Sequence, residues 1–347
     1  MACDRCDESR EAGMRFCPHC GQPLADDIVP KGEPKPFLKT VVAWTTAVVM
    51  ALLAFETLFL VIGAPDVFDW CQYHAMDVLV LIPNLVTACT ISGRTLQLAW
   101  VLIFAAAVAS IAMVIWRTYR QIPDNSGEPD CIERTDAYGM SRLFAASIAL
   151  SVISSIVLMS FGSGIDVPED LPVGSESSAI LSFTNAAVWE EIIARVAYIG
   201  LPMAIIAAVC RKGRDSLRFL LGGFGLSKAA IVLIVVSSLI FGFGHMSGWG
   251  LEKVLPTTLS GLIMGYAYVR YGIHVSIGIH FLTDFLGVLA GPDTLTLAAI
   301  FIMAVLVLGI LCLIDLLIGL NRSLDGVRDL PNWIPDRDSS ASRRDSD

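Results

Sequence analysis

Long apolar runs are the feature that most constrains what this chain can fold into. Several of them reach the ~20 residues that a helix needs to cross the hydrocarbon core of a bilayer. Only 16% of the 347 residues are charged, whereas soluble domains contain about 25%. The sequence therefore predicts an all-α polytopic membrane bundle of about eight spans, which we expect at residues 38–62, 96–116, 143–162, 179–209, 224–245, 254–270, 273–290 and 294–319.

Polar segments flank the apolar part of the chain and suggest a division into five regions. No cleavable signal peptide is visible, because the N-terminal residues are polar and lack a basic start followed by an apolar stretch. The expected regions are a cysteine-containing module at 1–25, a proline-containing linker at 26–37, a first set of membrane helices at 38–142, a membrane core at 143–320 and a disordered tail at 321–347.

The N-terminal module carries two cysteine pairs, Cys3-x-x-Cys6 and Cys17-x-x-Cys20, separated by ten residues. Four thiolates in two short knuckles suit a tetrahedral zinc ion. Two disulfides or a redox pair are the alternatives, but two matched pairs favour zinc. Because zinc binding supplies folding energy that so small a module lacks, we expect a zinc ribbon with structural zinc. Its expected role is to dock a protein partner.

The distribution of basic residues predicts how the chain crosses the membrane. Residues 76–92 are apolar but short and are interrupted by Pro83 and Asn84. If this stretch does not cross, the cytoplasmic side receives the basic residues Lys31, Lys35, Lys39, Arg117, Arg120, Arg211, Lys212, Arg214, Arg218, Arg270 and Arg322. The loops 63–75 and 163–178 on the opposite side contain no Lys or Arg. We therefore expect 76–92 to be re-entrant or interfacial. Both termini should be cytoplasmic in an integral protein of the plasma membrane.

Ionisable residues inside the spans point to function, because a charge at the bilayer centre costs ~2.5–3.5 kcal/mol or more. Glu191 and Arg195 are four residues apart, so they share a helical face and can pair. Glu190 is rotated by about 100° from Glu191 and remains available as a general base. The alternative is a structural network that pins two helices together.

Two further motifs place imidazoles and a carboxylate in the apolar part of the chain. Phe241 precedes His245 by one helical turn, and His280 and Asp284 share a face four residues apart. A packing histidine and a simple His–Asp hydrogen bond are the plainer interpretations. With alternating span directions, however, Glu190 falls in the same leaflet as both histidines. We therefore expect a shared site that hydrolyses a peptide bond.

These motifs, in this order, resemble the CPBP family, which contains CAAX prenyl endopeptidases and bacteriocin-processing proteins and is also called the Abi family. The family signature is E-E-x-x-x-R, then F-x-x-x-H, then H-x-x-x-N or D. Glu190-Glu191, Arg195, Phe241, His245, His280 and Asp284 fill its named positions. The resemblance covers about residues 140–320, and it implies an eight-helix membrane fold with proteolysis inside a membrane-embedded cavity.

The resemblance also implies roles for these residues. Glu190 would activate the attacking water, which His245 would help to hold. His280 and the residue at 284 would orient water or stabilise the oxyanion, and Glu191 and Arg195 would support Glu190. The family is described as metalloproteases, although Glu and His alone are an alternative. Asp284 replaces the Asn of prenyl endopeptidases, and its charge favours a catalytic zinc with Glu190, His245, His280 and Asp284 as ligands.

The partners follow from these expectations. Membrane lipid surrounds the chain, and the substrate would be a peptide or a membrane-protein segment. The predicted topology places the site on the outer side, whereas prenylated C-termini are presented from the cytosol. The net charge of −9 argues against nucleic acid. The alternatives to a protease are a non-catalytic scaffold or immunity protein that recruits partners through its zinc ribbon, and a proton or cation carrier.

Overall fold

The structure is a computed structural model that describes residues 36–82, 84–124, 132–161, 175–211, 214–289, 295–324 and 332. The expected zinc ribbon with Cys3, Cys6, Cys17 and Cys20, most of the linker and most of the C-terminal tail lie outside the described residues.

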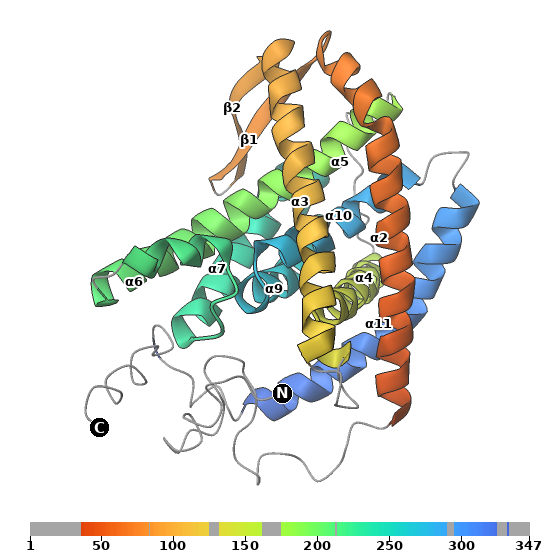
Figure 1. Ribbon diagram of the computed structural model, residues 1–347, viewed down its shortest axis with the longest axis vertical. Helices are drawn as coiled ribbons and strands as arrows, with labels where there is room; N and C mark the ends of the chain where they lie inside the picture. The colour runs from red at the N-terminus through yellow and green to blue at the C-terminus, as the bar shows by residue number, and fades with distance from the viewer. Residues whose placement is uncertain are drawn as a thin grey trace.

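Helices make up most of the described chain (Figure 1). Their order is α2 (Pro36–Cys71), α3 (Arg94–Asp124), η1 (Ile132–Arg134), α4 (Asp136–Ser160), α5 (Glu176–Glu191), η2 (Ile192–Gly200), α6 (Leu201–Arg211), η3 (Arg214–Leu221), α7 (Lys228–Gly244), α8 (Met246–Trp249), η4 (Leu251–Lys253), α9 (Val254–Arg270), α10 (Ile273–Leu289) and α11 (Leu295–Leu324). Two strands, β1 (Ala75–Ile82) and β2 (Asn84–Ser92), form the sheet.

The predicted all-α membrane bundle is confirmed. Six helical segments are long and apolar enough to cross a bilayer: Thr40–Cys71, Arg94–Ile122, Asp136–Ser160, Glu176–Val209, Lys228–Trp249 and Ala299–Ile318. The remaining two of the eight expected spans are the 17-residue helices α9 and α10. At 1.5 Å per residue each is about 26 Å long, which is less than the ~30 Å hydrocarbon core.

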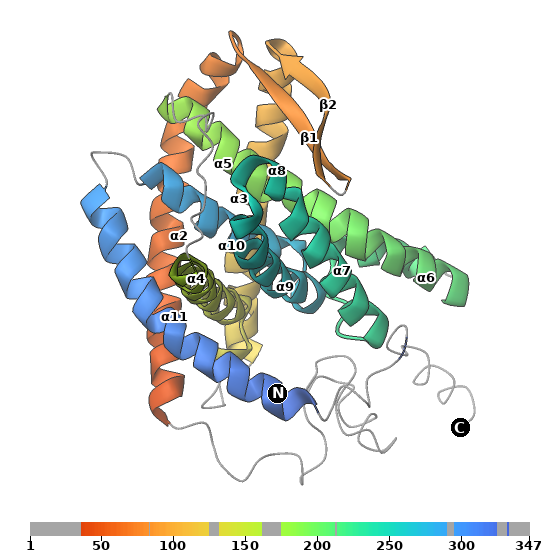
Figure 2. The same ribbon diagram turned by 180° about the vertical axis from the view of Figure 1, so that it is seen from behind.

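Helix α10 lies at the centre of the bundle (Figure 2), where α2, α3, α4, α5, α9 and α11 surround it. Most of its side chains are buried, including Val275, Ile279, Phe281 and Phe285. A helix that is apolar on all sides buries itself among other helices. Two of its polar residues, His280 and Asp284, are therefore presented to protein and not to lipid.

Strands β1 and β2, which cover most of the doubtful stretch 76–92, pair as an antiparallel hairpin that the sequence did not predict. In the register Val80 lies opposite Val86, and an irregularity follows Val78. β-branched side chains favour a pleated strand over a helix. The hairpin contacts α7 and α8 and lies at the end of the molecule opposite to the start of α2 and the end of α11 (Figure 1).

Helix α2 extends nine residues beyond the expected end at 62 and continues through Pro65 to Cys71. Proline leaves a carbonyl in the preceding turn without its usual partner. Nearby, the indole Nε1 of Trp100 donates to the Ala64 carbonyl at 3.2 Å, and Val67 and Cys71 are buried. This packing against α3 carries the helix past the expected end and delivers the chain to the hairpin.

Candidate active site

Glu191 and Arg195 form a fully buried ion pair at the junction of α5 and η2. The distance from Arg195 Nε to Glu191 Oε2 is 3.1 Å, and neither side chain is exposed. The Ser276 hydroxyl donates to the same Oε2, and Nδ1 of His280 lies 3.0 Å from Oε1. Arg195 also donates from Nη1 to the Ser237 hydroxyl at 3.0 Å. Glu191 is thus a structural centre that joins α5 to α10.

Glu190, unlike the neighbouring Glu191, lines a cavity. Its side chain is 22% exposed, and its Oε2 lies 3.7 Å from Nε2 of His245 and 3.8 Å from Nε2 of His280. These separations exceed a direct hydrogen bond, yet they are short enough for one water to bridge the atoms. The three groups come from α5, the end of α7 and α10.

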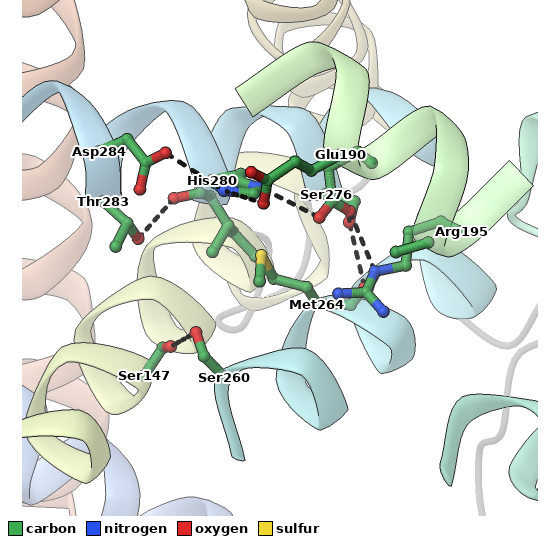
Figure 3. Close-up of polar contacts among 12 residues, drawn as sticks. Ser147, Glu190, Arg195, Ser260, Met264, Ser276, His280, Thr283 and Asp284 are labelled. Carbon is green, nitrogen blue, oxygen red and sulfur yellow. Dashed lines mark hydrogen bonds and ion pairs between the residues drawn. The ribbon is translucent and has the colours of Figure 1, made fainter. Parts of the chain in front are cut away.

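The two ring nitrogens of His280 both face carboxylates. Nδ1 lies near Glu191, and Nε2 lies 3.3 Å from Oδ2 of Asp284, one turn later on α10 (Figure 3). An N–H at either nitrogen therefore has an acceptor, and the two carboxylates fix the ring plane. Asp284 remains partly exposed to the cavity, with 24% of its side chain accessible.

His245 is oriented by the residue one turn before it. Its Nδ1 lies 2.8 Å from the Phe241 carbonyl, and because a carbonyl only accepts, Nδ1 carries the proton of this contact. Nε2 then faces Glu190. The buried Phe241 ring packs edge-on against both imidazoles, with centroids 4.8 Å from His245 and 6.0 Å from His280, and the Arg195 guanidinium lies over it at 5.2 Å.

Two adjoining cavities meet at Glu190. The larger, of about 670 Å³, is lined by side chains of α4, α5, α9 and α10, with His245, Lys253, His280 and Asp284 among them. The smaller, of about 210 Å³, lies between β1 and α5 and includes Leu79, Leu81 and Trp189. Glu190, Phe241 and Ser182 line both. A chain in an extended conformation could therefore pass over Glu190 from one cavity into the other.

The hairpin is attached to α5 and η2 beside this site. The indole Nε1 of Trp189 donates to the Leu79 carbonyl at 2.7 Å, and the Tyr198 hydroxyl donates to the Leu81 carbonyl. Leu81 is buried against Gly244, just before His245. The wall of the smaller cavity thus depends on the hairpin, whose part in the site was not apparent from the sequence.

The predicted catalytic zinc finds no support in this geometry. Within the described part of the chain, no group of three or more His, Cys, Asp and Glu side chains is arranged to hold a metal ion. Three of the four imidazole nitrogens already face protein acceptors. Nδ1 of His245 faces the Phe241 carbonyl, and the two nitrogens of His280 face the carboxylates of Glu191 and Asp284. Zinc at Glu190, His245, His280 and Asp284 stays a prediction, as does zinc in the ribbon.

Sequence reasoning missed several polar residues that the structure brings to the site. Ser276 lies one turn before His280 on the same helical face, so the spacing could have identified it. Ser237 bonds Arg195 from α7, and Lys253 lines the larger cavity. Glu56 on α2 was not missed, because the sequence marks it as an ionisable residue inside the first expected span. It is fully buried, and neither of its oxygens has a hydrogen-bond partner among the described residues.

Comparison with known proteins identifies the core that contains this site. Residues 174–286 match the family of type II CAAX prenyl endopeptidase Rce1-like proteins. This match spans the helices that carry Glu190, His245 and His280. No curated protein and no solved structure matched the chain. The matched family is a family of proteases, and the match covers the stretch that carries the three motifs, so it supports the resemblance that those motifs predicted.

Proposed function

We propose that this integral membrane protein is an intramembrane endopeptidase that hydrolyses a peptide bond with a water activated by Glu190. The observation that carries the proposal is the position of Glu190 Oε2, 3.7 Å and 3.8 Å from the Nε2 atoms of two histidines in one cavity. A carboxylate and imidazoles around one water are the groups that general-base catalysis requires.

In the proposed reaction Glu190 accepts a proton from the water as the water oxygen attacks the peptide carbonyl carbon. His245 and His280 hold the water in line for that attack. The carbonyl π electrons move to oxygen, and the tetrahedral oxyanion collapses as the C–N bond breaks. The Glu190 carboxyl then returns its proton to the leaving amine, so the side chain is restored.

The other motif residues do not touch the water themselves but hold His280 beside Glu190. Glu191 holds His280 through Nδ1, and Arg195 compensates the charge of Glu191 inside the bundle. Asp284 faces the opposite ring nitrogen of His280. With the ring held from both sides, rotation that would move Nε2 away from Glu190 is opposed. A histidine fixed in this way loses little entropy when the reaction geometry forms.

The proposed substrate is a peptide or a membrane-protein segment. The smaller cavity is lined largely by apolar side chains, whereas several hydroxyl groups line the larger one. On the predicted topology the site opens toward the outer side of the membrane, which argues against a C-terminus presented from the cytosol. The zinc ribbon, as the proposed docking module, would bring a protein partner to the cytoplasmic side.

The test compares membrane proteomes from cells that carry the native chain or Glu190→Gln. We expect one precursor to accumulate uncut in the variant, because loss of a general base lowers the rate by about 10²–10⁴-fold. Glu176→Gln is the matched control, since Glu176 begins the same helix, is exposed and lines neither cavity.

Two results would count against this function. A normally folded Glu190→Gln protein that processes the precursor as well as the native chain excludes Glu190 as the base. If no precursor changes in any variant while a binding partner is retained, the scaffold alternative is favoured instead. Folding of each variant is checked by its elution from a gel-filtration column and its unfolding temperature.

A further inference from the structure

Lys253 is the one Lys or Arg among the described residues that line the larger cavity. It ends η4, eight residues after His245, and its ammonium lies 4.4 Å from the centroid of the Trp249 ring. Trp249 lines the same cavity. The aromatic ring holds the ammonium by a cation–π interaction and so limits the positions that the flexible lysine stem can take.

The charges that face Lys253 come from separate elements. Glu190 on α5 and Asp284 on α10 attract the ammonium, and His245 and His280 line the same cavity. Burial lowers the pKa of Lys253, and the negative charges of Asp284 and Glu190 oppose that shift. The ammonium and the two carboxylates thus belong to one cavity and influence one another electrostatically.

The proposed reaction needs more hydrogen-bond donors for the oxyanion than the motif residues supply. An oxyanion develops on the peptide carbonyl, and it needs hydrogen-bond donors. At position 284 this chain has Asp, and an ionised carboxylate only accepts hydrogen bonds. The hydroxyls of Thr283 and Ser260 are already engaged, with the Ile279 carbonyl and with Ser147. A cation in the cavity would offset the charge of the developing oxyanion and of a nearby ionised Asp284.

The predicted side of the membrane for Lys253 is unusual for a basic residue. On the predicted topology, residues 246–253 face the outer side, where the loops 63–75 and 163–178 contain no Lys or Arg. The positive-inside rule disfavours lysine there. Lys253 nevertheless lies on that side, in the cavity that Glu190 and Asp284 also line, and a role in that cavity would explain its position.

We propose that Lys253 is a catalytic residue that donates a hydrogen bond to the oxyanion formed when water attacks the peptide carbonyl. The inference rests on the proposed protease function and deepens it. The ammonium keeps its proton throughout, so the proton removed from water still passes through Glu190 to the leaving amine. Lys253 thereby supplies the donor that Asp284 does not.

The experiment uses the full chain in lipid nanodiscs and the precursor identified with Glu190→Gln. Lys253→Met keeps the length of the side chain and removes the charge. We expect kcat to fall about 100-fold with little change in KM, as for loss of one oxyanion donor. Lys253→Arg restores part of kcat and retains it at higher pH than the native chain, because Arg stays charged where Lys loses its proton.

Lys228→Met is the matched control, since Lys228 begins α7, is exposed and lines neither cavity. A folded Lys253→Met protein with native kcat, beside an inactive Glu190→Gln protein, overturns the role of Lys253 alone. A loss seen only in KM overturns it as well. If Glu190→Gln cleaves the precursor at the native rate, the proposed function itself fails.

Discussion

Adjacent carboxylates on one helix have different surroundings in this protein. Glu191 is fully buried with Arg195, Ser276 and His280 as partners, whereas Glu190 faces a cavity and two imidazole nitrogens. A buried charge is stable only when it is paired and hydrogen-bonded. Glu191 meets that condition, so it can serve the site as a support that does not react.

Stability measurements test whether the buried Glu191–Arg195 pair supports the site. Glu191→Gln leaves the Arg195 guanidinium buried without its counter-charge, so we expect the free energy of unfolding to fall by about 3–5 kcal/mol. Arg195→Met should cost a similar amount for the reciprocal reason. The double variant should regain part of the loss, because no unpaired charge remains. Unfolding of the detergent-solubilised protein measures all three, and purely additive losses would contradict a coupled pair.

At the level of helix packing, the close approach of α7 and α9 sets the position of His245. Gly242 lies on α7 one residue before Phe243, and a Cβ built there would lie 2.8 Å from the Val254 carbonyl of α9 and in contact with Thr258. The absence of a side chain allows the backbones to pack tightly, as small residues do between membrane helices. This contact holds the end of α7 beside α9.

A single added methyl group probes that contact. Gly242→Ala should lower the free energy of unfolding by about 1–3 kcal/mol, because overpacking forces the two helices apart. It should also lower precursor cleavage, since His245 would move with the end of α7. Gly248→Ala is the control, because a Cβ at Gly248 meets nothing within 4 Å. Equal unfolding temperatures for the two variants would contradict a tight α7–α9 contact.

The positions of α2, α11 and the hairpin lead to a prediction of how the whole molecule is oriented in the membrane. The start of α2 and the end of α11 lie at one end of the bundle, and the hairpin lies at the other (Figure 1). Helix α2 is about 54 Å long at 1.5 Å per residue, well over the ~30 Å hydrocarbon core. The positive-inside rule predicts that the hairpin end faces outward.

Labelling with a membrane-impermeant maleimide tests that direction. Among the cysteines whose side chains the structure describes, Cys89 on β2 is exposed, whereas Cys71 and Cys312 are buried. The predicted topology places the remaining cysteines, including Cys210 at the end of α6, on the cytoplasmic side. Reagent added to intact cells should therefore label the native chain and not Cys89→Ser. Labelling that requires permeabilised membranes would reverse the predicted orientation and direct the site toward the cytosol.

The sequence by itself determined the membrane helices and the residue pairs within one helix. Apolar runs required a helical bundle because lipid cannot hydrogen-bond the backbone. Pro83 and Asn84 indicated that residues 76–92 do not form a spanning helix, but they did not predict the hairpin. The pairs Glu191–Arg195 and His280–Asp284 followed from their four-residue spacing, because helix geometry alone places such residues on one face.

Only the tertiary structure decided which helices bring their polar groups together. Ser276 and His280 reach Glu191 because α10 packs against α5, and Lys253 lines the cavity because η4 packs against α8 and α9. The hairpin beside Glu190 is likewise a product of its contacts with Trp189 and Tyr198. Spacing along a chain fixes neighbours within a helix, but contacts between helices depend on how all the buried side chains pack at once.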